Sequence, residues 1–334
     1  MVDFQSLLGS KGSVEAYDLE KIFNSLDVKS THTDPRPSQR EAFAELTRRK
    51  SEKDLILKIS TGAGKTAIGL LYLYGHMRVS GEPVVYLCPT RQLVDQVIEE
   101  AGQLGISAVD YPRGETYPKP EALRGESVLV CTYEKMFNAK STFKRHDVNL
   151  VPYAVVMDDA HAGVENIRKQ FTLRLGGEPY SVVLGFLEPG CKNYNKTKWM
   201  DISSGDPLAL FEVPHWVWTD LAPSVQEALH PYSQDDAFKF VWPFVKDVLP
   251  LCRCVISGDS LEIAPEVLPT DKVRAFSNAK HRLFMSATLA DDSLLVREFG
   301  ASAAAACDPI LPPSDKGLGE RMILAPGLVD ESLG

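Results

Sequence analysis

Ser60-Thr61-Gly62-Ala63-Gly64-Lys65-Thr66 is the stretch of sequence that decides the fold. The apolar run Asp54-Leu-Ile-Leu-Lys-Ile precedes it, and the longer run Ala67-Ile-Gly-Leu-Leu-Tyr-Leu-Tyr follows it. These lengths predict a strand, a glycine-rich turn and a helix, the setting in which such a stretch forms a phosphate-binding loop. In that loop, backbone N–H groups face phosphate oxygens, Lys65 reaches the β and γ phosphates, and Thr66 offers its hydroxyl to Mg²⁺.

Short apolar runs alternate with amphipathic stretches on both sides of this loop. Ser38 at a helix N-cap position, with Glu41 three residues later, predicts a helix that begins near Ser38. Strands are expected at 84–88, 127–132 and 154–159, and another helix at 93–104. Buried strands separated by helices predict an α/β fold of the P-loop NTPase kind, with a mostly parallel sheet and helices on both faces. Ligands of such sheets bind beyond the carboxyl ends of the strands.

Two further motifs follow the loop in chain order. Val155-Val-Met-Asp-Asp-Ala-His ends one expected strand, and Met285-Ser-Ala-Thr-Leu ends a later apolar run. The loop has Ile59 where the general phosphate-loop pattern has an outer glycine. With these features the sequence resembles the superfamily-two helicases and translocases of the DEAD/DEAH-box kind, and specifically their N-terminal ATP-binding domain, which is RecA-like. The resemblance covers roughly residues 35–162 and 275–300.

The resemblance implies catalytic roles for Lys65 and for the acidic box. Asp158 would hold Mg²⁺ through water together with Thr66, Asp159 would position the attacking water, and His161 closes the box. Asp159 replaces the Glu that is usual in the family, which withdraws the carboxylate by one carbon–carbon bond. A misplacement on the order of 1 Å can cost about a hundredfold in rate. Slow hydrolysis is therefore one expectation from this sequence.

Nucleic-acid contacts are expected from two other segments that resemble family motifs. Pro89, Thr90 and Arg91 follow the strand at 84–88, where the family offers backbone N–H groups and an Arg to phosphates. Thr132 and Tyr133 stand at the place of a second motif of this kind. The alternative for both segments is an ordinary strand-to-helix turn.

The remaining family motifs concern adenine and coupling. Gln39 stands ahead of the loop as the family's adenine-recognising Gln does, and its amide can both donate to and accept from the adenine edge. A surface Gln on a helix is the alternative. Ser286 and Thr288 are expected to couple the nucleotide site to nucleic-acid movement. ATP and Mg²⁺ are accordingly the expected cofactors.

The α/β rhythm breaks between residues 165 and 250, a stretch that holds all four Trp residues. It predicts an inserted subdomain with its own small core, after which the pattern is expected to resume at Cys254. The expected divisions are an N-terminal extension at 1–34, the helicase ATP-binding domain at 35–164 and 251–308, the insertion at 165–250, and a linker or tail at 309–334.

Composition sets limits on the partners. A net charge of −9 argues against coating nucleic acid by bulk electrostatics. Cys252 and Cys254 are one residue apart, but no second Cys or His pair completes a set of four metal ligands. No structural metal is therefore expected. Iron–sulfur helicases carry an insertion at the same place, but only Cys88 and Cys131 lie between the loop and the acidic box. No apolar stretch approaches the roughly 18 residues of a membrane span, and we expect a cytoplasmic protein without membrane contact.

After Thr288 only 46 of the 334 residues remain, which is too few for a second similar domain. We therefore expect two partners: nucleic acid, either DNA or RNA, and a second RecA-like domain in a longer parent protein or a separate subunit. A nucleotide-gated binding or regulatory module with little hydrolysis is the alternative function. An unrelated P-loop phosphotransferase would leave the motifs at 89–91 and 286–288 unexplained.

Overall fold

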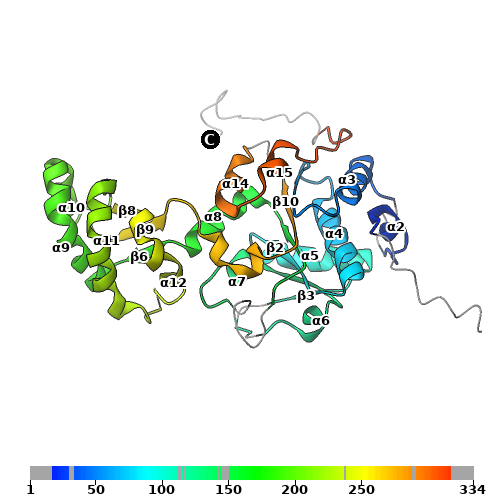
Figure 1. The fold of residues 1–334 in the computed structure, drawn as a ribbon, viewed down its shortest axis with the longest axis horizontal. Coiled ribbons are helices and arrows are strands. Elements are labelled where there is room, and N and C mark those ends of the chain that lie inside the picture. The colour runs from blue at the N-terminus through cyan, green and yellow to red at the C-terminus, as the bar shows by residue number, and fades with distance from the viewer. Residues whose placement is uncertain are drawn as a thin grey trace, which may run out of the picture.

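The computed structural model describes residues 17–29, 34–111, 114–115, 117–141, 143, 150–236, 238–287 and 291–316. These residues form an elongated molecule with two lobes, a larger one around a parallel sheet and a smaller one beyond helix α8 (Ala160–Gln170) (Figure 1). None of the helices they form is long and apolar enough to cross a membrane.

The larger lobe is built on a parallel sheet with the strand order β1-β10-β5-β2-β4-β3. Its strands are β1 (Asp54–Lys58), β2 (Val84–Cys88), β3 (Ala108–Asp110), β4 (Val128–Thr132), β5 (Ala154–Met157) and β10 (His281–Ser286). The prediction of a parallel α/β sheet is therefore confirmed, and each strand expected before residue 160 is present.

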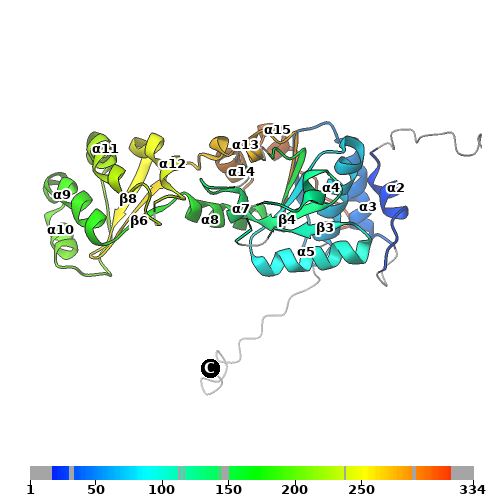
Figure 2. The same ribbon diagram turned by 90° about the horizontal axis from the view of Figure 1, so that it is seen from below.

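Both faces of this sheet are covered. In β1, Leu55 and Leu57 point into one core and Ile56 into the other, since side chains alternate along a strand. The first core is covered by α2 (Leu19–Asn24), α3 (Pro37–Arg48), α4 (Lys65–Ser80) and α5 (Arg91–Leu104). The second is covered by α6 (Pro120–Leu123), α7 (Tyr133–Met136), α8, α13 (Arg274–Ser277), α14 (Ser293–Phe299) and α15 (Ala303–Cys307). Figure 2 shows α5 and the pair α14 and α15 on opposite sides of the sheet.

The segment before residue 35 belongs in part to this lobe. Helix α2 buries Leu19, Ile22 and Phe23 in the first core, against α3 and α4. Phe23 lies 6.1 Å from Phe43 of α3, measured between ring centroids. Residues 17–29 are therefore not simply an extension, because their apolar side chains are part of the core that covers α4.

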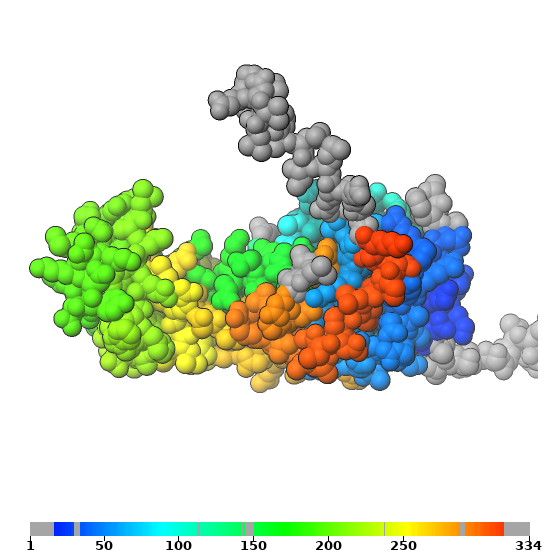
Figure 3. Space-filling model, turned by 90° about the horizontal axis from the view of Figure 1, so that it is seen from above, coloured from blue at the N-terminus to red at the C-terminus, as the bar shows by residue number. Residues whose placement is uncertain are grey.

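The segment after residue 308 also packs on the larger lobe. Ile310 forms a parallel bridge with Leu57, and its N–H donates to the carbonyl oxygen of Ile56 at 2.7 Å. Asp315 accepts a hydrogen bond from the N–H of Ser60 at 2.6 Å, at the first residue of the phosphate loop. Figure 3 shows these red C-terminal residues against the blue N-terminal ones. Residues 309–316 thus line the open edge of β1 and are not a free linker.

The smaller lobe has its own antiparallel sheet and its own core. The strand order is β6-β9-β8-β7, with bounds β6 (Leu173–Leu175), β7 (Phe211–Glu212), β8 (Cys252–Ile256) and β9 (Leu261–Pro265). Helices α9 (Gly177–Tyr194), α10 (Lys196–Ser203), α11 (His215–Leu229) and α12 (Trp242–Val245) pack with it. Trp199, Trp218 and Trp242 lie in this core, whereas Trp216 is exposed.

The sequence-based expectation that the main sheet resumes at Cys254 is wrong. Strand β8 pairs with β7 and β9 in the smaller lobe, and the chain returns to the main sheet only at β10. Cys252 and Cys254 both point into the lobe's core, and Arg253 between them points outward. This alternation is typical of an antiparallel strand with one covered face, whereas the central strands of the main sheet are apolar throughout.

The two lobes are joined by α8 and by the chain that returns from β9 to β10. Glu298 of α14 is fully buried at this junction. Its carboxylate pairs with Arg168 of α8 at 2.9 Å and accepts from the N–H of Leu268 at 3.0 Å. The guanidinium of Arg168 also donates to the carbonyl oxygen of Pro265 at 3.1 Å. One carboxylate therefore ties the outgoing helix to the returning chain.

Candidate nucleotide site

The phosphate loop lies between β1 and α4, as the sequence predicts. Gly62 and Gly64 have φ values of 79° and 84°, in the left-handed region that glycine adopts freely. A Cβ atom at Gly64 would lie 2.2 Å from Nε2 of Gln39, and at this φ any other side chain would strain the backbone. Lys65 and Thr66 begin α4, whose first N–H groups have no acceptor within the helix and whose N-terminus is the positive end of the helix dipole. This geometry fits a bound phosphate chain.

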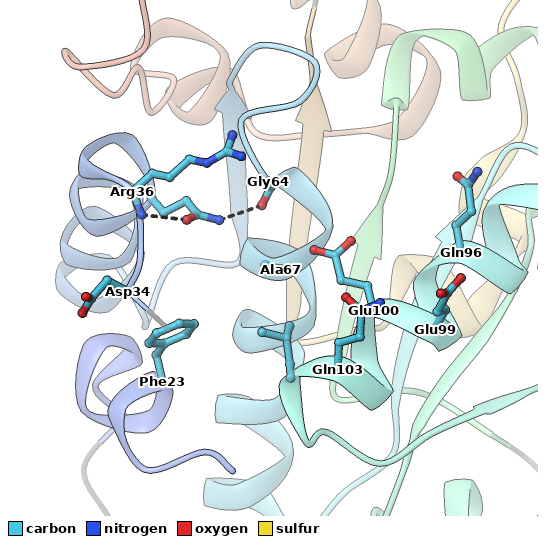
Figure 4. A pocket seen from close by; sticks show the side chains of 11 residues that line it. Phe23, Asp34, Arg36, Gly64, Ala67, Gln96, Glu99, Glu100 and Gln103 are labelled. Atoms are coloured by element: carbon cyan, nitrogen blue, oxygen red, sulfur yellow. Dashed lines mark hydrogen bonds between the residues drawn. The ribbon is translucent and has the colours of Figure 1, made fainter. Parts of the chain in front are cut away.

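Gln39 holds the loop in place. Its Oε1 accepts from the N–H of Arg36 at 2.9 Å, and its Nε2 donates to the carbonyl oxygen of Gly64 at 3.4 Å (Figure 4). The guanidinium of Arg36 donates to the carbonyl oxygen of Gly62. Helix α3 begins at Pro37, close to the expected Ser38, but its N-cap is Arg36, and Ser38 lies inside the first turn.

A cavity of about 400 Å³ opens beside the loop, between α2 and α3 on one side and α4 and α5 on the other. Phe23 and Gln39 line it together with Gly64, and Glu99 and Glu100 line the opposite wall (Figure 4). An aromatic ring beside an amide that can donate and accept fits a planar base. Neither Phe23 nor Glu100 could be predicted from a local pattern, because their helices are far from the loop in the sequence.

Glu100 reaches the first turn of α4. Its carboxylate accepts hydrogen bonds from the hydroxyl of Thr66 and the N–H of Ala67, the end of α4 toward which it points in Figure 4. Burial raises the pKa of the Glu100 carboxyl, and these two hydrogen bonds oppose that rise. An anionic group therefore already lies at the donors that a nucleotide phosphate would use.

Asp158 is fixed directly after β5. Its N–H donates to the carbonyl oxygen of Leu87 at 3.0 Å, and the hydroxyl of Tyr86 donates to its Oδ2 at 3.1 Å. Burial raises the pKa of the Asp158 carboxyl, and the positive charge of Lys65 opposes the rise. The structure thus brings the lysine of the phosphate loop and the first acid of the box together. Carboxylate and hydroxyl oxygens, such as those of Asp158 and Thr66, are the ligands that Mg²⁺ prefers.

Asp159 has an unusual backbone conformation. Its φ is 49°, and no other described residue except glycine has a positive φ. Asp visits this left-handed region more readily than most side chains, because its short polar group can bond locally. The conformation gives a physical reason for Asp at a position where the family usually has Glu.

His161 connects the acidic box to the Ser-Ala-Thr motif. Its Nδ1 lies 2.9 Å from Oγ of Ser286, which is fully buried at the end of β10. Thr288, the other expected coupling residue, lies outside the described residues. Asp292, at the start of α14, was not expected at this site. Its carboxylate forms an ion pair with Lys58 at 2.8 Å.

A second cavity, of about 500 Å³, lies at the carboxyl ends of β2 and β4. It brings together four of the five expected contact residues, Pro89, Thr90, Arg91 and Thr132. Thr90 caps α5 by accepting from the N–H of Leu93 at 3.3 Å. The cavity is also lined by Lys135 and Tyr111, which sequence analysis missed. Lys135 Nζ lies 4.0 Å from the centroid of the Tyr111 ring.

The side chain of Tyr133 does not line this cavity, and the expected nucleic-acid contact of its backbone stays a prediction. Tyr133 is 1% exposed, and its hydroxyl donates to the carbonyl oxygen of Asp158 at 2.5 Å. Its ring also packs beside Gly163, where a Cβ atom would lie 2.8 Å from the ring. Tyr133 therefore stabilises the acidic box through a hydrogen bond to Asp158 and packing against Gly163.

The parallel sheet, the phosphate loop and the acidic box define a P-loop domain of the RecA-like class. Residues 36–176 match the family described as DEAD/DEAH box helicase. This part of the chain is thus similar to DEAD/DEAH box helicases. No curated protein matches the sequence.

Solved structures of helicases are among those similar to this chain. One is described as the structure of S. tokodaii Xpd4; identity is 19%, the match covers 79% of this chain and 60% of that one, and the TM-score is 0.47. Another is the RNA-helicase Prp28 from Chaetomium thermophilum bound to ADP, with 25% identity, 50% and 46% coverage, and a TM-score of 0.33. The chain spans about three fifths or less of the length of these structures.

Proposed function

We propose that this chain is the ATP-binding domain of an ATP-dependent nucleic-acid helicase or translocase. In this proposal it hydrolyses ATP with Mg²⁺ when a second RecA-like domain completes the site. The observation that carries the proposal is the buried carboxylate of Asp158, on which the positive charge of Lys65 acts, together with a phosphate loop whose Gly64 has a φ of 84°. The match of residues 36–176 to the helicase family supports it.

The roles of individual residues follow from their positions. Lys65 and the N–H groups at the start of α4 would bind the phosphates, and Thr66 and Asp158 would hold Mg²⁺. Bound Mg²⁺ neutralises phosphate charge. Gln39, beside the cavity, would recognise adenine, although its amide bonds the chain in this structure. Asp159 would orient the attacking water.

Nucleic acid would bind at the second cavity. Thr90 and Thr132 offer hydroxyl and backbone groups at adjacent strand ends, and Lys135 adds a positive charge. Such contacts position phosphates without reading bases, so they fit single strands of DNA or RNA alike.

The second candidate function is a nucleotide-gated module with little or no hydrolysis. The left-handed backbone of Asp159 favours it, because this conformation suits the shorter acid that is retracted from the water position. Glu100, which occupies donors of α4, also favours weak nucleotide binding.

The two functions separate in one experiment. ATP hydrolysis is measured with and without single-stranded DNA and RNA, for the chain, for Lys65→Ala and for Lys50→Ala, an exposed lysine that serves as control. Turnover that nucleic acid stimulates and that only Lys65→Ala abolishes supports the helicase. ATP binding that Lys65→Ala abolishes, without turnover in the chain or when a second domain is supplied, supports the module. Binding and turnover that Lys65→Ala leaves intact would refute both.

A further inference from the structure

A buried ion pair joins the phosphate-loop strand to the segment after the Ser-Ala-Thr motif. Nζ of Lys58 lies 2.8 Å from Oδ2 of Asp292, and the two side chains are 13% and 6% exposed. Lys58 is two residues before Ser60, the first residue of the loop. A buried charge is costly unless it is paired, so this pair fixes the carboxylate of Asp292 firmly.

The other oxygen of this carboxylate faces His161. Oδ1 of Asp292 and Nε2 of His161 are both buried and lack hydrogen-bond partners, and they lie 3.6 Å apart. On its other side, the ring of His161 meets Ser286 through Nδ1 at 2.9 Å. Orphaned buried polar atoms are rare in folded proteins and call for an explanation. Here each unpaired atom faces the other at slightly more than hydrogen-bond distance, so each is the natural partner of the other.

We propose that Asp292 is a positioning residue for the acidic box: it accepts a hydrogen bond from Nε2–H of His161 and so fixes the tautomer of that ring. A neutral imidazole has one donor and one acceptor nitrogen, and the bond at one nitrogen sets the role of the other. With the proton on Nε2, Nδ1 accepts from the hydroxyl of Ser286. A closing movement of about 0.5 Å between α8 and α14 completes the bond.

The result is a chain of polar contacts through four elements. Lys58 at the end of β1, Asp292 at α14, His161 at α8 and Ser286 at β10 each touch the next. This series of contacts connects the phosphate loop to the strand that carries the coupling motif. A movement of the loop would therefore change the hydrogen bond between Asp292 and His161. The role in coupling rests on the proposed function, whereas the tautomer itself does not.

The isosteric change Asp292→Asn tests the proposal, because it replaces the carboxylate oxygen that faces His161, an acceptor, by an amide NH₂, a donor. The ammonium of Lys58 can only donate, so the amide oxygen of the new side chain must face it. The amide NH₂ then faces Nε2 of His161 and requires that nitrogen to accept. The proton of His161 is expected to move to Nδ1, while the volume of the side chain stays the same.

Nitrogen NMR of the ¹⁵N-histidine-labelled chain reads the tautomer directly, with His161→Gln to assign the signal. We expect Nε2–H in the unchanged chain and Nδ1–H in Asp292→Asn. Asp247→Asn, whose carboxylate pairs with Lys272 at 3.2 Å, removes a charge elsewhere and is the control that is expected to keep Nε2–H. The pair Lys58→Met with Asp292→Leu removes the acceptor without leaving a buried charge, and the tautomer preference should then disappear. An Nδ1–H ring in the unchanged chain, or an unaltered ring in both variants, would overturn the proposal.

Turnover provides the second readout. If the chain hydrolyses ATP, Asp292→Asn is expected to lower kcat about tenfold, as loss of a supporting hydrogen bond commonly does, with little change in KM for ATP. A rise in KM alone would contradict a positioning role. A chain that keeps the Nε2–H ring but shows no turnover even with a second domain refutes the helicase proposal and leaves the assignment of Asp292 standing.

Discussion

The guanidinium of Arg91 is held by the carboxylate of Asp110, with Nη1 donating to Oδ1 at 2.5 Å. Nη2 donates to Asp110 as well, and to Asp95 at 3.0 Å. Arg91 was expected to bind nucleic-acid phosphates, and in this structure a protein carboxylate takes the place of the phosphate. Bidentate pairing of this kind suits Arg, whose planar fork matches either anion.

Asp110→Asn should therefore strengthen the binding of single-stranded nucleic acid. Exposed ion pairs are worth about 0.2–1 kcal/mol, so release of Arg91 predicts a gain of up to about fivefold in affinity. Fluorescence anisotropy with a labelled oligonucleotide at two salt concentrations measures it. Glu126→Gln makes the same change in net charge where the carboxylate pairs with Arg124, and it serves as control. Equal gains in both variants would mean that net charge alone is responsible.

His76 predicts a loss of stability in acid. It is buried in α4, stacked on His281 with ring centroids 4.3 Å apart, and its Nε2 has no hydrogen-bond partner. Burial, with a smaller contribution from His281, lowers the pKa of His76 to about 3. Because the unfolded chain binds the proton near pH 6.5 and the folded chain does not, stability falls as the pH drops below about 6.5. The loss reaches about 2 kcal/mol by pH 5.

Thermal unfolding of His76→Phe at pH 8 and pH 5 checks this prediction. The variant should lose less stability between the two pH values than the unchanged chain does. His215→Phe replaces an exposed histidine on α11 and should leave the pH dependence unaltered. If His76→Phe has the same acid sensitivity as the unchanged chain, another group is responsible.

The main sheet could be predicted because its signals are local. Each strand from β1 to β5 that was expected is an apolar run next to a turn or a helix, and the phosphate loop identifies itself within seven residues. Strand β8 was assigned to the wrong sheet because a short run such as Cys252–Ile256 does not say which partner it pairs with. Only the outward Arg253 hinted at a half-exposed strand.

The surroundings of the site could be predicted less well, since they depend on packing between distant elements. Glu100 reads in the sequence as part of the polar face of α5, and only the crossing of α5 with α4 brings it to Thr66. Asp292 reads as a loop carboxylate, yet it is paired with Lys58. Tyr133 reads as a motif residue and is instead buried under Asp158. No local pattern distinguishes these cases.

The left-handed backbone at Asp159 predicts how substitutions there affect stability. Most side chains cost roughly 1–2 kcal/mol in this conformation, Asp costs less, and Gly adopts it freely. Asp159→Glu should therefore lower Tm by about 2–4 °C, and Asp159→Gly should not lower it. Asp220→Glu inside α11 is the control, because Glu is there the better helix former. A Tm for Asp159→Glu at or above that of the unchanged chain would contradict the prediction.

The carboxylate of Glu100 predicts that the chain restricts its own nucleotide binding. It accepts from the Thr66 hydroxyl and the Ala67 N–H, the groups that a phosphate and its Mg²⁺ would use, and it lines the same cavity. Glu100→Gln removes the negative charge and keeps the shape. Removal of one like charge at a partly buried site predicts a gain of about tenfold in affinity for a fluorescent ADP analogue.

The pH dependence has a definite sign. Because burial raises the pKa of Glu100, acidification neutralises this carboxyl earlier than an exposed one, and nucleotide affinity should rise as the pH falls. In Glu100→Gln this rise should be absent. Glu99→Gln on the same helix also lines the cavity and controls for titration of the nucleotide itself. Weaker binding by Glu100→Gln would show that the carboxylate instead holds Thr66 in its binding position, and that its charge is not the obstacle.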